Sequence, residues 1–178
     1  MTPNLKKIGI FSLLLLSTTV NAMPTKECTF LNEDQKQVVT RAYQLGEDSD
    51  YGMTLAAIAL TESKAGEQLI NKVSGDYGVF QNNLKNTVRM IEQRTGSKMS
   101  YRQIQGLKKE LIRNMDESGM YAQMNIEFWE QVHGKEAWSK IIASYNAGYN
   151  YSGSKGQTYL AEVKNNLRKL RNCNCIER

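Results

Sequence analysis

Apolar residues recur at intervals of three and four along most of this chain, which is the spacing of helices with one buried face. The pattern predicts helices over residues 33–46, 51–63, 83–96, 100–114, 118–134, 135–148 and 156–171. Residues 149–157 read as a loop, and the chain shows no internal repeat, low-complexity run or proline-rich linker. The sequence therefore predicts a single all-α domain of about six to seven helices.

Two stretches depart from the amphipathic pattern. Residues 51–63, YGMTLAAIALTES, are apolar on nearly every side, which indicates a helix buried at the centre of the domain. Residues 74–81, SGDYGVFQ, form neither a good helix nor an alternating strand. Gly75 and Gly78 favour backbone conformations that other residues avoid, so we expect a short irregular or β-like turn there.

The first 22 residues have the features of a secretory signal peptide. Lys6 and Lys7 precede an apolar run over 8–20, and Val20-Asn21-Ala22 suits cleavage after a small residue. We expect a signal peptide at 1–22 and a folded domain at 23–178, in a periplasmic or secreted protein without a stable membrane span after cleavage. An uncleaved anchor is the alternative.

The net charge of +5 includes the two lysines of the leading segment, so the remainder is only mildly basic. No block of like charge indicates nucleic acid as a partner. A small positive excess suits an anionic polymer outside the cytoplasm.

Three cysteines lie near the two ends of the expected domain. In an oxidising compartment, Cys28 is expected to pair with either Cys173 or Cys175 and to tie the ends together. A zinc site is disfavoured, because the chain has one histidine, His133, and no CxxC motif. His133 precedes Gly134, which suits the end of a helix. We expect no metal.

Glu62 is the residue that breaks the apolar pattern of the central helix. Helical geometry places Ile58 and Ala59 on its own face, one turn back. Partial desolvation and the negative end of the helix dipole should both raise the pKa of Glu62. A carboxylic acid that stays protonated near neutral pH can act as a general acid. The alternative is a surface glutamate on a frayed last turn.

Three short motifs then occur in order along the chain: Glu62-Ser63, Gly78-Val79-Phe80-Gln81 and Tyr145-Asn146-Ala147-Gly148. They resemble the Glu-Ser pair, the Gly-Leu-Met-Gln turn and the Ala-Tyr-Asn-Ala-Gly element of the lytic transglycosylase (SLT) family in the lysozyme-like superfamily. The resemblance covers roughly residues 35 to 165 and implies a lysozyme-like fold with the turn beside an active-site cleft. Small transglycosylases of secretion and conjugation machines are similar in length and layout, and so are phage-borne wall-degrading proteins.

The resemblance implies an enzyme that cleaves the MurNAc–GlcNAc bond of peptidoglycan and leaves 1,6-anhydromuramic ends. Glu62 would be the catalytic acid and then the base, without any cofactor or metal. Ser63, Gln81, Tyr145 and Asn146 would bind substrate. For three of these residues a purely structural role is the alternative: Ser63 as a helix cap, Gln81 as an amide bonded to loop backbone, and Tyr145 as a buried phenol. The implied partners are peptidoglycan strands and an envelope-spanning secretion or conjugation machine.

Asp76 decides between two enzyme hypotheses. If it faces Glu62 across the cleft, it is a second carboxylate and the protein is a hydrolytic lysozyme. We favour the alternative, in which Asp76 is a turn residue bonded to backbone N–H groups. A third hypothesis is a non-catalytic wall-binding or assembly subunit with the same fold. Trp129 and Trp138 are expected in the core rather than as platforms for sugar rings.

Overall fold

The computed structural model describes residues 26–176; the expected signal segment 1–22 lies outside them. Seven α-helices form most of the described chain, which confirms the all-α prediction. They are α1 (Glu33–Leu45), α2 (Gly52–Ser63), α3 (Leu84–Thr95), α4 (Tyr101–Arg113), α5 (Met115–His133), α6 (Trp138–Ala147) and α7 (Ser154–Asn172), with a 3-10 turn, η1 (Gly148–Asn150), after α6.

The helix boundaries differ from the predicted ones where capping decides them. Helix α5 begins three residues earlier than expected, because the Asn114 side chain accepts hydrogen bonds from the backbone N–H groups of Asp116 and Glu117. Helix α6 begins at Trp138, not at residue 135, because backbone bonds around Gly134 and Ala137 form a turn between the two helices.

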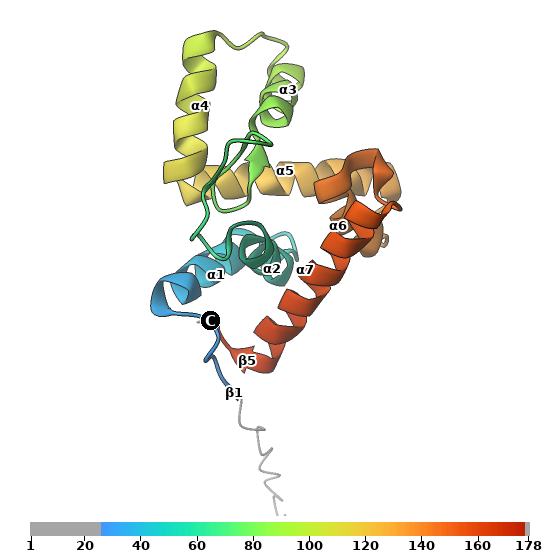
Figure 1. Ribbon diagram of the computed structural model, residues 1–178. Coiled ribbons are helices and arrows are strands. Elements are labelled where there is room, and N and C mark those ends of the chain that lie inside the picture. Colours follow the sequence, from blue (N-terminus) through green and yellow to red (C-terminus); the bar gives the residue numbers. More distant parts are fainter. Residues whose placement is uncertain (1–25, 177–178) are drawn as a thin grey trace, which may run out of the picture.

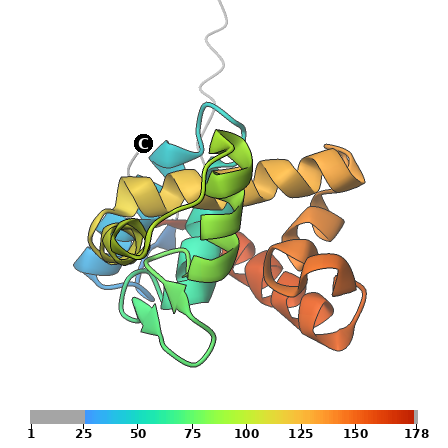
Figure 2. The ribbon, with the colours of Figure 1, turned by 90° about the horizontal axis from the view of Figure 1, so that it is seen from above.

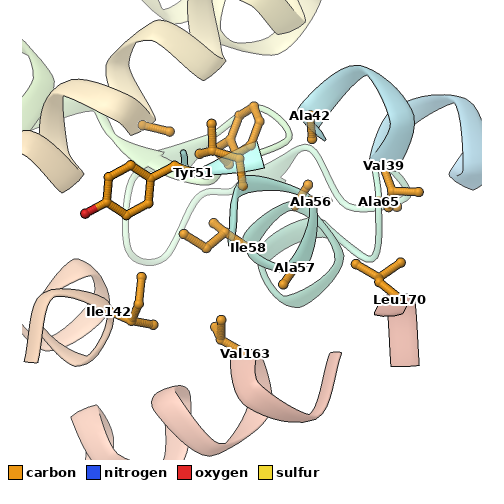
Figure 3. Packing of buried hydrophobic residues seen from close by; sticks show 14 of the residues in the cluster. Val39, Ala42, Tyr51, Ala56, Ala57, Ile58, Ala65, Ile142, Val163 and Leu170 are labelled. Atoms are coloured by element: carbon orange, nitrogen blue, oxygen red, sulfur yellow. The ribbon is translucent and has the colours of Figure 1, made fainter. Parts of the chain in front are cut away.

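Helix α2 lies at the centre of the main core, as its uniformly apolar sequence predicted. Its residues from Leu55 to Ala59 are fully buried. Figure 3 shows Ile58 and Ala57 of α2 with Val39 of α1, Ile142 of α6, and Val163 and Leu170 of α7 around them. Burial on all sides explains why α2 lacks the polar face that the other helices carry.

The remaining helices are arranged around α2 (Figure 1). Helix α5 crosses the molecule, α3 and α4 rise on one side of it, and α6 and α7 lie on the other. A second, smaller core is formed by Tyr77 of the turn together with Leu107 and Leu111 of α4, and apolar side chains of α3 pack against it. Seen from above, the small sheet described below lies on one side of the molecule and α6 and α7 on the other (Figure 2).

The two ends of the described chain lie side by side (Figure 1). Strand β1 (Lys26–Glu27) pairs in parallel with β5 (Cys173–Asn174), and Cys28 forms a disulfide with Cys175. Of the two pairings that the sequence left open, the structure selects Cys175 and leaves Cys173 as a thiol. Within residues 26–176, no helix is both long and apolar enough to cross a membrane.

Candidate active site

The glycine-flanked turn is part of a small three-stranded antiparallel sheet. Strand β3 (Asp76–Tyr77) pairs with β2 (Ile70–Asn71) on one side and β4 (Asn82–Asn83) on the other. Gly78 adopts a left-handed φ of +83°, and a Cβ there would collide with the Leu111 carbonyl oxygen and the Ser118 hydroxyl. Glycine at this position therefore lets the sheet pack against α4 and α5.

A cleft opens between this sheet and the helices α3, α5, α6 and α7. Five of the six residues singled out in the sequence line it: Glu62, Asp76, Gln81, Tyr145 and Asn146. Four more asparagines share its walls, Asn82, Asn83, Asn86 and Asn125. Because a side-chain amide offers both donors and an acceptor, such a cleft suits a ligand rich in hydroxyl and amide groups.

Glu62 reaches this cleft from the last turn of the buried helix. Helix α2 ends at Ser63, since Lys64 and Ala65 both adopt left-handed backbone conformations, with φ of 53° and 54°. Burial of the carboxyl raises the pKa of Glu62 to about 7, and the negative charge of Asp76 adds to the effect. Glu62 is therefore protonated in a large fraction of molecules at neutral pH.

Tyr159 of α7 is the neighbour of Glu62 that sequence reasoning missed. Its hydroxyl is buried with no hydrogen-bond partner among the described atoms, so its geometry towards Glu62 falls short of a full hydrogen bond. It is nevertheless close enough that its donor character holds the pKa of Glu62 below the value that burial alone would give. In the sequence, Tyr159 looks like any core aromatic residue of an amphipathic helix, and no separate signal marks it.

Asp76 lines the same cleft as Glu62 and is not bonded to the turn backbone. Its carboxylate accepts a hydrogen bond of 2.8 Å from the side-chain amide of Asn83. The favoured expectation of a backbone-bonded turn residue was therefore wrong, because β3 pairs with β4 and brings Asn83 beside Asp76. Both carboxyl groups lie in one cleft.

Gln81 lies at the end of the turn with a left-handed φ of 46°. Its side-chain nitrogen donates to the carbonyl oxygens of Gln68 and Gly78, at 3.0 and 2.9 Å. Both N–H groups are thereby used on backbone, so only the Oε1 atom is left to accept a hydrogen bond from a ligand. Gln81 therefore has the structural role considered for it, as an amide bonded to loop backbone, while it also lines the cleft.

Tyr145 and Asn146 enter the cleft from the last turn of α6. The Tyr145 hydroxyl donates to the carbonyl oxygen of Phe80 at 3.0 Å and so fixes the turn that carries Gln81. Burial and the nearby carboxyl groups of Glu62 and Asp76 raise the pKa of Tyr145 well above its ordinary value, so this phenol stays neutral. Its ring lies parallel to that of Tyr159, with centroids 6.2 Å apart.

Ser63 is the predicted site residue that the structure keeps out of the cleft. Its side chain is fully buried; the hydroxyl donates to the Ala59 carbonyl oxygen at 3.1 Å and accepts from the Gly66 N–H at 2.9 Å. A substrate role is therefore excluded by burial. Ser63 instead closes the end of α2 and holds the loop that follows.

The two tryptophans differ. Trp138 packs against the core as expected, and its indole N–H donates to the Thr54 hydroxyl at 3.2 Å. Trp129 is also buried, but it lines one end of the cleft as well, with the exposed ring of Tyr149 edge-on to it at 5.0 Å. Within residues 26–176, no group of three or more histidine, cysteine or acidic side chains is placed to hold a metal ion.

Comparison with known proteins gives one distant relative. The chain is 29% identical, over 189 residues, to an uncharacterized 20.7 kDa protein in the vs-regB intergenic region of Enterobacteria phage T4, and the alignment covers 97% of this chain and 98% of the relative. No protein-family model and no solved structure matches the chain.

Proposed function

We propose that this protein is a peptidoglycan lytic transglycosylase of the SLT type, with Glu62 as its catalytic acid and base. The observation that carries the proposal is a carboxyl group with a pKa of about 7 in a cleft lined with amides. A general acid works best when its pKa lies near the operating pH, and amide side chains match the hydroxyl and acetamido groups of the glycan.

In the proposed reaction, the proton of Glu62 passes to the glycosidic oxygen while the bond from that oxygen to the anomeric carbon breaks. The resulting oxocarbenium-like carbon lies in the cleft with Glu62, now ionised. Glu62 then takes the proton of the muramic acid 6-hydroxyl, whose oxygen bonds to the anomeric carbon. The product carries a 1,6-anhydro ring, water is not consumed, and Glu62 ends protonated as it began.

The surrounding residues support this role. The negative charge of Asp76 adds to the rise in the pKa of Glu62 that burial causes, which helps to keep the acid protonated before the reaction. Gln81 and Asn146 line the cleft, and we assign the Oε1 atom of Gln81 and the amide of Asn146 as contacts to the glycan.

Hydrolysis is the second candidate, and the position of Asp76 in the cleft favours it. A second carboxylate can stabilise the cation or bond to it until water completes the reaction, as in a retaining lysozyme. The two candidates differ in their products: the transglycosylase leaves 1,6-anhydro ends and the lysozyme leaves reducing ends.

The test is digestion of purified cell walls, with the products identified by mass spectrometry. Glu62→Gln should lower the rate by about 10²- to 10⁴-fold, since the amide keeps the shape but cannot exchange a proton. Glu127→Gln, an exposed substitution on α5, is the matched control and should cleave normally. Activity of Glu62→Gln within a few-fold of the wild type would remove Glu62 from the mechanism.

The same digestion separates the alternatives. Anhydro ends, with Asp76→Asn retaining much of the activity, support the transglycosylase. Reducing ends, with Asp76→Asn as inactive as Glu62→Gln, make the protein a two-carboxylate lysozyme. Walls that remain intact with the wild-type protein indicate a wall-binding subunit.

The setting is proposed to be a periplasmic or secreted one, where the disulfide and the wall substrate are both found. Secretion or conjugation machines and phages both use such proteins. The similarity to a protein of phage T4 favours the phage setting of the two.

A further inference from the structure

The cleft does not end at Glu62. A second groove begins there and follows the loop and strand that lead into the hairpin, lined by residues 66–73. Glu62 and Gln81 line both grooves, and the remaining lining residues of the two differ. The acid therefore lies where two grooves meet, with the amide-rich groove on the β3 and β4 side and the second groove on the β2 side.

The second groove has the composition of a sugar-binding surface. Its polar side chains, such as Gln68 and Lys72, offer donors and acceptors for hydroxyl groups. Ile70 is about half exposed and Val73 is fully exposed, at 49% and 100% of their surfaces. A pyranose ring presents an apolar face and a rim of hydroxyl groups, so a wall that combines both kinds of side chain matches it.

The second groove is also formed before any ligand arrives. The Gly78 N–H donates to the Leu69 carbonyl oxygen at 2.8 Å, and the Gln81 side chain donates to the Gln68 carbonyl oxygen at 3.0 Å. Asn71 accepts from the N–H groups of Val73 and Ser74, which fixes the hairpin tip. A surface held in this way loses little conformational entropy on binding.

We propose that the second groove binds the part of a glycan strand that lies beyond the scissile bond, so that the protein cleaves internal bonds of the strand. This inference rests on the proposed function of Glu62. An enzyme that acts from strand ends needs a barrier on one side of its acid. In this protein, an open groove that suits sugar rings extends from Glu62 on each side.

The test uses long, uncrosslinked glycan strands and follows the length distribution of the products through the first tenth of the reaction. Internal cleavage should shorten the mean strand length steeply before any disaccharide accumulates. Release of disaccharides from the start, with the remaining strands close to full length, would overturn the inference while leaving the proposed function intact. Strands left uncleaved by the wild type, as by Glu62→Gln, would overturn both.

A variant tests the groove itself. Ile70→Ala combined with Gln68→Ala removes an apolar contact and an amide from the second groove, at positions whose side chains make no hydrogen bond that holds the fold. We expect kcat/KM on long strands to fall about five- to tenfold relative to kcat/KM on a tetrasaccharide. Tyr101→Ala, an exposed change on α4 away from both grooves, is the control and should leave this ratio unchanged. An unchanged ratio in the double variant would contradict the groove assignment.

Discussion

Replacing Glu62 by glutamine should make the protein more stable at alkaline pH. In the unfolded chain a glutamate has its ordinary pKa of 4.5, whereas burial raises the pKa of Glu62 to about 7 in the folded protein. The folded state therefore binds the proton more tightly. Stability is unaffected below the unfolded pKa, falls as the pH rises from about 4.5 to about 7, and stays at the lower value above that.

The magnitude follows from the two pKa values. Each pKa unit corresponds to about 1.4 kcal/mol, so the carboxylate costs the folded protein up to about 3 kcal/mol at pH 8. The cleft admits water, which screens the charge, so this figure is an upper limit. Glutamine has nearly the same shape and is neutral at every pH, and Glu62→Gln therefore removes the cost.

The assay is urea denaturation of both proteins, with the disulfide intact, at a series of pH values from about 4 to about 8.5. The free energy of unfolding of Glu62→Gln should equal that of the wild type at the acid end. At pH 8 it should exceed the wild-type value by 1 to 3 kcal/mol, roughly the range set by the pKa difference. Glu127→Gln, which changes an exposed glutamate of α5, is the control; it keeps Glu62, and its free energy of unfolding should follow the wild-type value across the pH series.

Two outcomes would refute the reasoning. A Glu62→Gln protein that is less stable than the wild type at pH 8 would mean that the carboxylate makes favourable contacts outweighing its desolvation. A difference in stability that stays constant with pH would mean that the pKa of Glu62 is not raised by the fold. Either result would also weaken the proposal of Glu62 as a general acid.

Two further predictions concern the ends of the chain and the partner of the acid. Cys28→Ser should lower the free energy of unfolding by about 5 kcal/mol in the chain-entropy estimate, since the disulfide closes a loop of 147 residues, whereas Cys173→Ser should have little effect in the same denaturation assay. A loss below about 1 kcal/mol for Cys28→Ser would contradict this estimate. Tyr159→Phe should raise the pKa of Glu62 further, because the hydroxyl lowers it, and should move the alkaline limb of the pH–activity profile upward. An unmoved alkaline limb would show that the hydroxyl does not act on the acid.

Most of the helices could be predicted from the sequence because each buries one continuous stripe of apolar side chains. Helix α2 could be singled out because it has no polar face. The first residues of α5 and α6 could not be predicted. They depend on the hydrogen bonds that the Asn114 side chain accepts and on the backbone bonds of the turn around Gly134. A β-like turn at 74–81 was expected, but its pairing with β2 and β4 was not, because hydrogen bonds between neighbouring two-residue segments define these strands and no local periodicity does.

The site shows the same division. The positions of Glu62 and Gln81 in the cleft could be predicted, because a carboxyl after an apolar run and an amide after a glycine turn are unusual for their surroundings. Ser63 follows Glu62 directly, but on a helix adjacent residues face about 100° apart, so one side chain reaches the cleft and the other is buried. Tyr159 was missed because its importance comes only from the packing of α7 against α2.

The buried run before Glu62 links the stability of this protein to its proposed chemistry. A carboxyl with a pKa near 7 requires low polarity around it, and α2 supplies this because residues from Leu55 to Ala59 are fully buried. The same core, with the disulfide that joins the chain ends, must outweigh the cost of holding the acid there. Substitutions that loosen the packing of α2 would let more water reach Glu62 and lower its pKa. The activity of such variants at neutral pH is therefore expected to decline before the fold is lost, since added water changes the pKa of Glu62 more than it changes the stability of the helix.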